Sequence, residues 1–229
     1  MAQILGGGIP PVNESEIAVI RELRDRAPDD WFVLHNIEIP IRRGHREFDK
    51  FEVDLIVVTG HSVCLIDVKG TRGRIHVHGR RWYPERREPF GSPVAKLRAH
   101  ARALKGQLTQ GRPALSGVYV DALVVLTADD AVLRDQSNRP DADAHDVTTL
   151  PLLIRTLSDL SRVRQGMLRD ITPYHQAIKE ALNATTRRPT GPLRFGNWQV
   201  QERLGGTDEV VEYRAVNATA PTAGTVLLR

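Results

Sequence analysis

The chain has 229 residues, of which 41% are hydrophobic and 26% are charged, an ordinary balance for a globular protein with one core and a second small unit. A single cysteine excludes an internal disulfide framework and any multi-cysteine zinc site. The net charge of +4 favours contact with nucleic acid, and no window resembles a membrane span or a secretion signal, which predicts a cytoplasmic protein without membrane contact.

The chain opens with a Gly- and Pro-rich lead-in, residues 1–13, followed by a predicted helix at residues 13–26. Asn13 is a suitable N-cap, and Glu16 stands three residues later, as in a capping box. Glu16 also lies on the apolar stripe of Ile20 and Leu23, so it either caps the helix or points into a site as a further carboxylate. Short strands are expected at residues 31–34 and 37–41, ended by Pro40, with a charged loop at residues 42–50.

Residues 52–69 read as two apolar, β-branched strands joined by a tight turn at Gly60 and His61. Glycine in the first loop position predicts a type II′ turn closed by Thr59 and Ser62. Cross-strand partners then have numbers that sum to 121. Two further pairs follow from this register: Asp54 opposite Asp67, and Glu52 opposite Lys69.

Alternation along the strands places Asp54, Asp67 and Lys69 on one face. Two neighbouring carboxylates repel each other, and a bound cation reverses that cost. Hard cations such as Mg²⁺ bind carboxylate oxygens, and a neighbouring lysine can hold a water or a phosphate oxygen. The pattern therefore predicts a metal-dependent phosphodiesterase site.

The segment from residue 70 to residue 112 is strongly basic, with eleven Lys or Arg and two Glu interspersed with Trp82, Tyr83 and Phe90. Such a mixture is typical of a surface that follows a nucleic-acid backbone, although a solvated strand edge and helix face would also show it. We expect a turn at residues 70–73 and a half-exposed strand at residues 74–82. The predicted nucleic-acid contacts are Arg72, Arg74, Arg80, Arg81, Arg86, Arg87 and Lys96.

Ser92 and Pro93 form the expected start of a helix, a cap followed by proline in the first helical position. The buried stripe of this helix is predicted to contain Val94, Leu97, Ala101, Leu104 and Leu108. The apolar run at residues 118–127 reads as a central strand covered on both faces. A strand, a helix and a buried strand in succession indicate a crossover, so the predicted fold class is α/β, with a mixed sheet flanked by helices.

The C-terminal part is predicted to contain a long loop at residues 128–146 and two closing helices at residues 150–163 and 173–184. Residues 185–193 have the composition of a linker. Three short strands are then expected at residues 198–204, 210–216 and 225–228, forming a small β piece at residues 194–229.

The order of these elements resembles the nuclease-related domain (NERD) of the PD-(D/E)xK nuclease superfamily over residues 14–184. The resemblance rests on Asp54, then twelve residues, then Asp67-Val68-Lys69, with Glu16 on the preceding helix. It implies a metal held by Asp54, Asp67, the Val68 carbonyl and Glu16, with Lys69 as a catalytic group. The chain departs from the family in having Asp67 in place of the usual Glu, and Lys96 in place of a glutamine.

Residues 194–229 resemble the first strands of a protein kinase. Residues 204–215 lie where a glycine-rich loop and second strand would be, without regular G-x-G-x-x-G spacing, and Arg229 falls at the position of the kinase lysine. No kinase activity is expected from this chain. A nuclease-related domain followed by a kinase domain resembles the kinases of BREX phage-defence systems.

Together these features predict a Mg²⁺- or Mn²⁺-dependent deoxyribonuclease, part of a larger anti-phage kinase. The alternative is a nucleic-acid-sensing module that regulates the attached kinase without significant cleavage. DNA is the expected partner, but the sequence does not separate DNA from RNA. The resemblance further implies contacts with other defence-system proteins and leaves a homo-oligomer open.

Overall fold

The computed structural model describes residues 2–5, 13–43, 46–135, 142–186, 194–195, 198–206, 211–220 and 224–228. The chain divides into two compact units, Met1–Arg188 and Pro189–Arg229. Each unit has its own sheet, and the α/β class predicted from the sequence is confirmed. Among the described residues, none of the helices combines the length and the apolar composition needed to span a lipid bilayer.

The first unit is built on a six-stranded mixed sheet with the strand order β1-β2-β3-β4-β8-β10. Its strands are β1 (Gln3–Ile4), β2 (Phe32–Arg43), β3 (Arg46–Val58), β4 (Ser62–Lys69), β8 (Tyr119–Leu126) and β10 (Val147–Thr149). Strands β2, β3 and β4 pair antiparallel, whereas β8 pairs parallel to both β4 and β10. Helix α2 (Pro93–Thr109) lies in the connection from β4 to β8, as expected for a parallel crossover.

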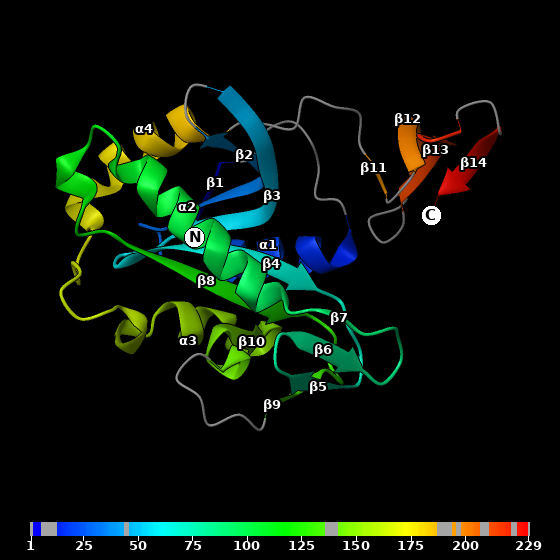
Figure 1. Cartoon of the computed structure of the whole chain (residues 1–229), viewed down its shortest axis with the longest axis horizontal. Helices are drawn as coiled ribbons and strands as arrows, with labels where there is room; N and C mark the ends of the chain where they lie inside the picture. Colours follow the sequence, from blue (N-terminus) through cyan, green and yellow to red (C-terminus); the bar gives the residue numbers. More distant parts are fainter. Residues whose placement is uncertain are drawn as a thin grey trace. The chain divides into compact units, whose positions relative to one another are not determined.

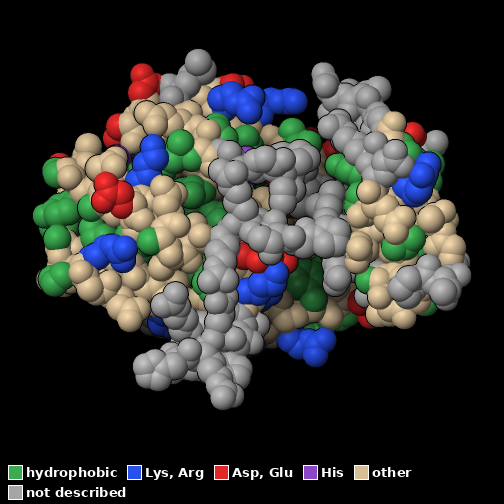
Figure 2. Space-filling model, turned by 90° about the horizontal axis from the view of Figure 1, so that it is seen from above, with side chains coloured by type: hydrophobic (Ala, Val, Ile, Leu, Met, Phe, Trp, Pro, Cys, Tyr) green, Lys and Arg blue, Asp and Glu red, His purple; other side chains and the backbone are tan. Residues whose placement is uncertain are grey.

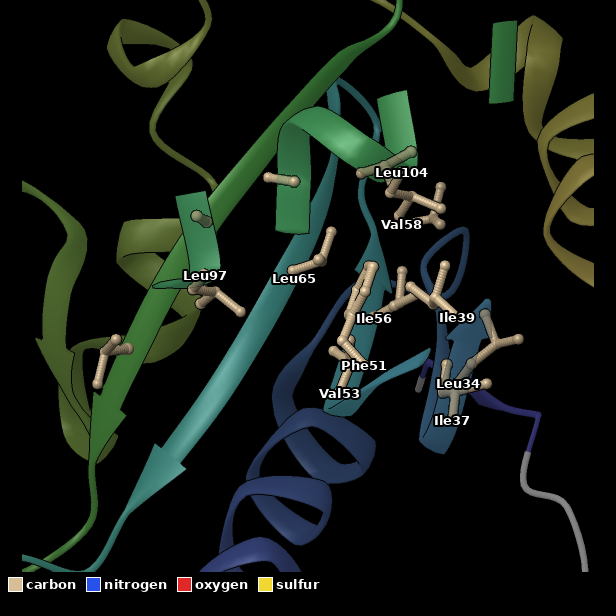
Figure 3. Close-up of a cluster of buried hydrophobic side chains, with 14 of the residues drawn as sticks. Leu34, Ile37, Ile39, Phe51, Val53, Ile56, Val58, Leu65, Leu97 and Leu104 are labelled. Atoms are coloured by element: carbon tan, nitrogen blue, oxygen red, sulfur yellow. The ribbon is translucent and has the colours of Figure 1, made fainter. Parts of the chain in front are cut away.

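Helices cover both faces of this sheet (Figure 1). The stripe predicted on α2 is buried in full, and Leu97 and Leu104 point toward Leu65 and Val58 of the sheet (Figure 3). Helix α4 (His175–Thr185) packs into the same cluster. The opposite face is covered by α1 (Glu14–Arg26) and the short α3 (Leu153–Leu157).

A second, four-stranded sheet of the first unit has the order β7-β6-β5-β9. The strand predicted at residues 74–82 is instead a hairpin of β5 (Arg74–His78) and β6 (Arg81–Pro84), because Gly79 adopts a φ of 62° and reverses the chain. Part of the segment predicted to be a loop, residues 128–146, forms a strand instead. It contains β9 (Val132–Asp135), which pairs with β5, while β7 (Phe90–Gly91) pairs with β6.

The two short strands and charged loop predicted at residues 31–50 were wrong, because β2 and β3 are long and continuous. The break expected between the two short strands, near residue 36, corresponds to a kink in β2. Asn36 has a φ of 51°, and the strand continues beyond it. Pro40 does not end β2, because β1 pairs only with Phe32 and Val33, so the strand is at an edge there.

The register of the β3-β4 hairpin is confirmed from Val58 opposite Val63 to Leu55 opposite Ile66. The type II′ turn is wrong, since Gly60 does not have a positive φ. Instead, the Thr59 hydroxyl accepts hydrogen bonds from the N–H groups of His61 and Ser62, at 3.2 and 3.0 Å. The Thr59 carbonyl lies 2.9 Å from Nε2 of His175 on α4, so a tertiary contact shapes the turn.

The predicted helix at residues 150–163 is broken into η3 (Leu150–Leu152), α3 and η4 (Leu160–Arg162). The Asp159 carboxylate accepts a hydrogen bond from the Ser161 N–H at 2.9 Å, which competes with helix continuation. Three further short 3₁₀ turns are η1 (Pro113–Leu115), η2 (Asp143–Asp146) and η5 (Thr172–Tyr174).

The second unit is a four-stranded antiparallel sheet with the order β11-β12-β13-β14. It consists of β11 (Arg194–Phe195), β12 (Trp198–Gly206), β13 (Val211–Asn217) and β14 (Thr225–Leu228), and the three predicted strands are confirmed. Most of the predicted linker lies outside the described residues, as do residues 207–210 of the glycine-rich segment and Arg229.

Candidate active site

Asp54 lies where the pairing of β3 is interrupted on both sides. On one side, the pairs with β2 pass from His35 and Leu55 to Ile37 and Val53, omitting the kinked Asn36. On the other side, the described backbone pairs with β4 end at Leu55 and Ile66. At this point the Asp54 side chain contacts β4 instead, because its Oδ2 accepts a hydrogen bond of 2.7 Å from the Val68 N–H. The predicted pairing of Asp54 with Asp67 is therefore replaced by a side-chain contact one residue further along β4.

Asp67 and Lys69 lie at the end of β4 and contact each other directly. The Lys69 ammonium lies 2.7 Å from Oδ1 of Asp67, and both side chains are partly exposed. The Val68 side chain between them is buried against the α1 face of the sheet, as strand alternation requires. Asp67 and Lys69 thus face the α2 side together, as the sequence predicted.

The carboxylates and lysine open into a cavity of about 320 Å³, here called the carboxylate cavity. Asp54, Asp67 and Lys69 line one part of it, together with Glu52. The first turns of α2 line another part. The α2 residues on this wall include Pro93, Lys96, Leu97 and His100. The helix that the sequence predicted after Ser92 therefore begins beside the carboxylates.

The electrostatics of the cavity centre on Asp54. Burial raises the pKa of Asp54 from 3.8 to about 7, and the neighbouring Asp67 charge acts in the same direction. The Val68 N–H lowers this pKa, Glu16 raises it, and the Lys69 charge lowers it. Ionisation of Asp54 is therefore disfavoured chiefly by burial and further by Asp67, and a carboxyl group perturbed in this way is a property shared by cation-binding and acid–base sites.

Of the two interpretations of Glu16 that the sequence left open, the structure confirms the capping role, and ligation of a metal by Glu16 stays a prediction. Its N–H donates to the Asn13 side chain at 3.0 Å, and its carboxylate accepts from the Asn13 amide at 2.7 Å, so the two residues cap α1 reciprocally. The Glu16 side chain is also buried, and its charge reaches Asp54. Ser15 holds this turn of α1 near the end of β4, since its hydroxyl lies 2.9 Å from that of Thr127 and a Cβ on Gly70 would collide with it at 2.8 Å.

The donor set suits a hard cation with few protein ligands. Within the described residues, no group of three or more His, Cys, Asp or Glu side chains is arranged to hold a metal, so Glu16 does not complete a three-carboxylate cluster. One oxygen of Asp54 accepts a hydrogen bond from the Val68 N–H, and one oxygen of Asp67 accepts a hydrogen bond from Lys69. Mg²⁺ is commonly bound by one or two carboxylates and several waters, so this pair fits it. Ligation by the Val68 carbonyl stays a prediction.

The predicted nucleic-acid contacts are all exposed, and one of them lies at the carboxylate cavity. Lys96 is exposed and lines the cavity. The remaining six arginines are exposed on the turn after β4 and on the β5-β6-β7 segment. They are Arg72, Arg74, Arg80, Arg81, Arg86 and Arg87. We refer to the last four as the hairpin arginines.

Acidic neighbours and burial limit the basic surface. Arg74 lies 3.9 Å from Glu85, and Arg86 lies 3.4 Å from Asp130, both at exposed positions where an ion pair is weak. Trp82, one of the aromatic residues interspersed in the basic segment, is fully buried and cannot stack on a base. On the face shown in Figure 2, the described Lys and Arg side chains are interspersed with Asp and Glu rather than gathered into one basic patch.

Asp143, a buried carboxylate that the sequence did not predict, stabilises the wall of the carboxylate cavity. Oδ2 of Asp143 accepts hydrogen bonds from the Trp82 indole at 2.7 Å and the Ser92 hydroxyl at 2.6 Å. Ser92 also caps α2 by accepting from the Ala95 N–H. Asp143 thus ties the start of α2 to β6. Its only sequence signal was an acidic residue in a polar segment that read as a loop.

Comparison with known protein families identifies the chain as a nuclease-related protein. Residues 12–127, just over half of the 229-residue chain, match the nuclease-related domain (NERD), and the chain belongs to this family. The matched range runs from the residue before Asn13 to the end of the β8 region, so it contains Glu16, Asp54, Asp67, Lys69 and Lys96.

A curated relative is the "Probable kinase PglW" of Streptomyces coelicolor, which is 23% identical over 222 residues. The match covers 93% of this chain but 13% of that protein, so the chain spans about an eighth of the length of this relative. No solved structure matches the chain.

Proposed function

We propose that the first unit hydrolyses DNA phosphodiester bonds with the help of Mg²⁺ or Mn²⁺. The observation that supports this most directly is the meeting of Asp54, Asp67 and Lys69 in one cavity, where the pKa of Asp54 is raised to about 7. A pair of carboxylates, one of them buried, beside a lysine is suited to bind a divalent cation and a phosphate together. Membership of the nuclease-related family supports the same reaction class.

The side chains have separate roles in this proposal. Asp54 and Asp67 would hold the cation, with the Val68 carbonyl as a further proposed ligand and Glu16 acting through its charge on Asp54. When bound, the cation lowers the pKa of a coordinated water and neutralises charge on the phosphate. Lys69 leaves Asp67 to orient the attacking water or to bind a phosphate oxygen. Asp54 must lose its proton to act as a ligand, so cleavage should increase with pH through about 7.

In this proposal the backbone of the substrate is held by exposed basic side chains, of which Lys96 lines the carboxylate cavity: the hairpin arginines, Arg72, Arg74 and Lys96. DNA is the proposed substrate, and the cytoplasm is the proposed place of action. The similarity to a probable kinase supports a role as the N-terminal part of a larger anti-phage kinase, in contact with other defence proteins.

The decisive experiment incubates the purified chain with plasmid, linear and single-stranded DNA, each with Mg²⁺, Mn²⁺ or EDTA. Asp67→Ala should lower the cleavage rate by at least about a hundredfold, because the cation loses one of its carboxylates, and Lys69→Ala should lower it similarly. Asp129→Asn, which neutralises an exposed carboxylate away from the cavity, is the matched control. Wild-type cleavage by Asp67→Ala would refute the assignment.

A second candidate function is nucleic-acid sensing without cleavage, in the service of an attached kinase. The favouring observation is that each carboxylate already has a hydrogen-bond donor within the protein. The Val68 N–H donates to Asp54, and Lys69 donates to Asp67. These contacts let the site keep its geometry without a cation. Under this alternative, DNA binding is indifferent to EDTA, and no DNA form is cut at any concentration of Mg²⁺ or Mn²⁺.

A further inference from the structure

A second cavity of about 290 Å³ lies on the other flank of α2. It shares no lining residue with the carboxylate cavity. Pro93, Lys96 and His100 face the carboxylate cavity, whereas Arg98, Arg102 and Lys105 face this one, and the buried stripe of α2 runs between the two sets. Its remaining walls are the N-terminal half of β8 and the segment around Arg164 and Met167. We call it the arginine cavity.

The acidic groups of the arginine cavity are already neutralised. Asp121 is buried and accepts from the Arg162 guanidinium at 2.8 Å. Asp146 contacts Arg98 at 2.6 Å and Arg162 at 2.9 Å. The two arginines neutralise the two carboxylates, so these four side chains together contribute no net charge to the cavity. They form a rigid, hydrogen-bonded floor for the cavity.

Three further cations face the same space. Lys105 donates to the carbonyls of Leu115, Ser116 and Val118, so its protons are engaged while its charge remains. Arg102 and Arg164 are exposed at the mouth. Among the described residues, Arg102, Lys105 and Arg164 make no contact with a carboxylate within 4.0 Å. The cavity therefore has a surplus of positive charge, which favours an anionic ligand.

The rest of the lining favours a ligand that is planar and apolar in part. Tyr119 is half-buried, and the Arg164 guanidinium lies 6.0 Å from the centre of its ring. The Tyr119 hydroxyl lies 3.5 Å from Oδ1 of Asp121, and burial raises its pKa, so the ring rather than the hydroxyl is the part available to a ligand. Ala101, Val118 and Met167 supply apolar walls. An aromatic ring beside arginines is a frequent surface for binding nucleobases.

We propose that the arginine cavity binds a free mononucleotide, with its phosphate between Arg102 and Arg164 and its base against Tyr119. The guanidinium groups match the oxygens of a phosphate in geometry, and Lys105 adds to the attractive field. The volume of about 290 Å³ suits one nucleotide rather than a folded strand. This site is separate from phosphodiester cleavage and does not depend on the function proposed above.

The test is calorimetric titration of the full chain with AMP, with adenosine and with inorganic phosphate, all in EDTA. AMP should bind saturably, and adenosine and phosphate should each bind much more weakly. Arg102→Ala and Arg164→Ala should each weaken AMP binding by about tenfold, the usual effect of losing one hydrogen bond to a charged group. Tyr119→Leu should weaken AMP binding without changing the affinity for phosphate. Arg24→Ala, at an exposed arginine of α1 that lines neither cavity, is the matched control.

Three outcomes would overturn the proposal. The first is the absence of saturable AMP binding to the wild-type chain. The second is unchanged AMP affinity in the combined Arg102→Ala and Arg164→Ala variant with an unaltered melting temperature, which would place the nucleotide elsewhere. The third is displacement of AMP by a 5′-phosphorylated oligonucleotide at far lower concentration, which would make the ligand a strand end instead of a free nucleotide.

Discussion

Replacing Asp54 with asparagine should stabilise the protein above neutral pH and leave it nearly unchanged in acid. Asparagine keeps the shape of the side chain and an oxygen that can accept from the Val68 N–H. It removes the charge that burial and Asp67 disfavour. The perturbation therefore isolates the electrostatic cost of ionising Asp54.

The size of the effect follows from the pKa of Asp54. This pKa is about 7 in the folded protein, against an ordinary value of 3.8 for an aspartate, so folding becomes less favourable when Asp54 ionises. The stability that protonated Asp54 provides is fully present below the lower value and is lost as pH rises to about 7. A pKa raised by about 3 corresponds to about 4 kcal/mol in total, of which about 3 kcal/mol falls between pH 5 and pH 8.

The assay is thermal unfolding followed by circular dichroism at about pH 5 and about pH 8, in EDTA and in Mg²⁺. The change of about 3 kcal/mol between the two pH values should widen the gap in melting temperature between Asp54→Asn and wild type by on the order of 8 °C from the lower pH to the higher. Added Mg²⁺ should stabilise the wild type at that pH and have little effect on the variant. Asp129→Asn is the control, because Asp129 is exposed. A difference between Asp54→Asn and wild type that is independent of pH would refute the reasoning.

Three other measurements address the surface, the wall and the turn of the same unit. Changing the hairpin arginines to alanine should weaken DNA binding. It should also reduce the slope of log affinity against log salt by about 0.9 for each phosphate that is no longer neutralised. Unchanged affinity in anisotropy titrations at low salt would place the DNA elsewhere. Asp143→Ala should cost about 3 kcal/mol in urea unfolding, because the Trp82 and Ser92 donors lose their acceptor, whereas Asp143→Asn should cost less, and equal losses would contradict this account. Gly60→Ala should change stability by less than about 1 kcal/mol, since Gly60 has no positive φ and an added Cβ meets nothing closer than 3.7 Å; a larger loss would show that the turn needs glycine.

The hairpin and α2 could be predicted because their signals are local. A continuous apolar run with one tight turn allows only one register that places both apolar faces correctly, so the pairs from Val58 to Leu55 followed from the sequence. The buried stripe of α2 followed from the period of the helix and from the Ser-Pro start. The convergence of Asp54, Asp67 and Lys69 follows from the hairpin register, although the contact of Asp54 with the Val68 N–H replaces the predicted pair with Asp67.

The parts that were missed depend on interactions between distant residues. Asn36 and Pro40 are breakers by local rules, but pairing with β3 carries β2 through both positions. The chain reversal at Gly79 pairs β5 with both β6 and β9, which the alternation of residues 74–82 does not reveal. The hydrogen bonds of Asp143 span 61 and 51 residues along the chain, and no local pattern specifies them.

Lys96 provides a means to separate cleavage from sensing. It stands where the resemblance to the family leads us to expect a glutamine, and it faces the carboxylate cavity from α2 while Lys69 faces it from β4. Two lysines opposite Asp54 and Asp67 balance much of their charge, so a phosphate could enter without a cation. If the site serves sensing, Lys96→Gln should weaken DNA binding equally in EDTA and in Mg²⁺, measured by anisotropy. If the site serves cleavage, the cation takes part in holding the phosphate, and Mg²⁺ should largely restore the affinity that Lys96→Gln loses in EDTA.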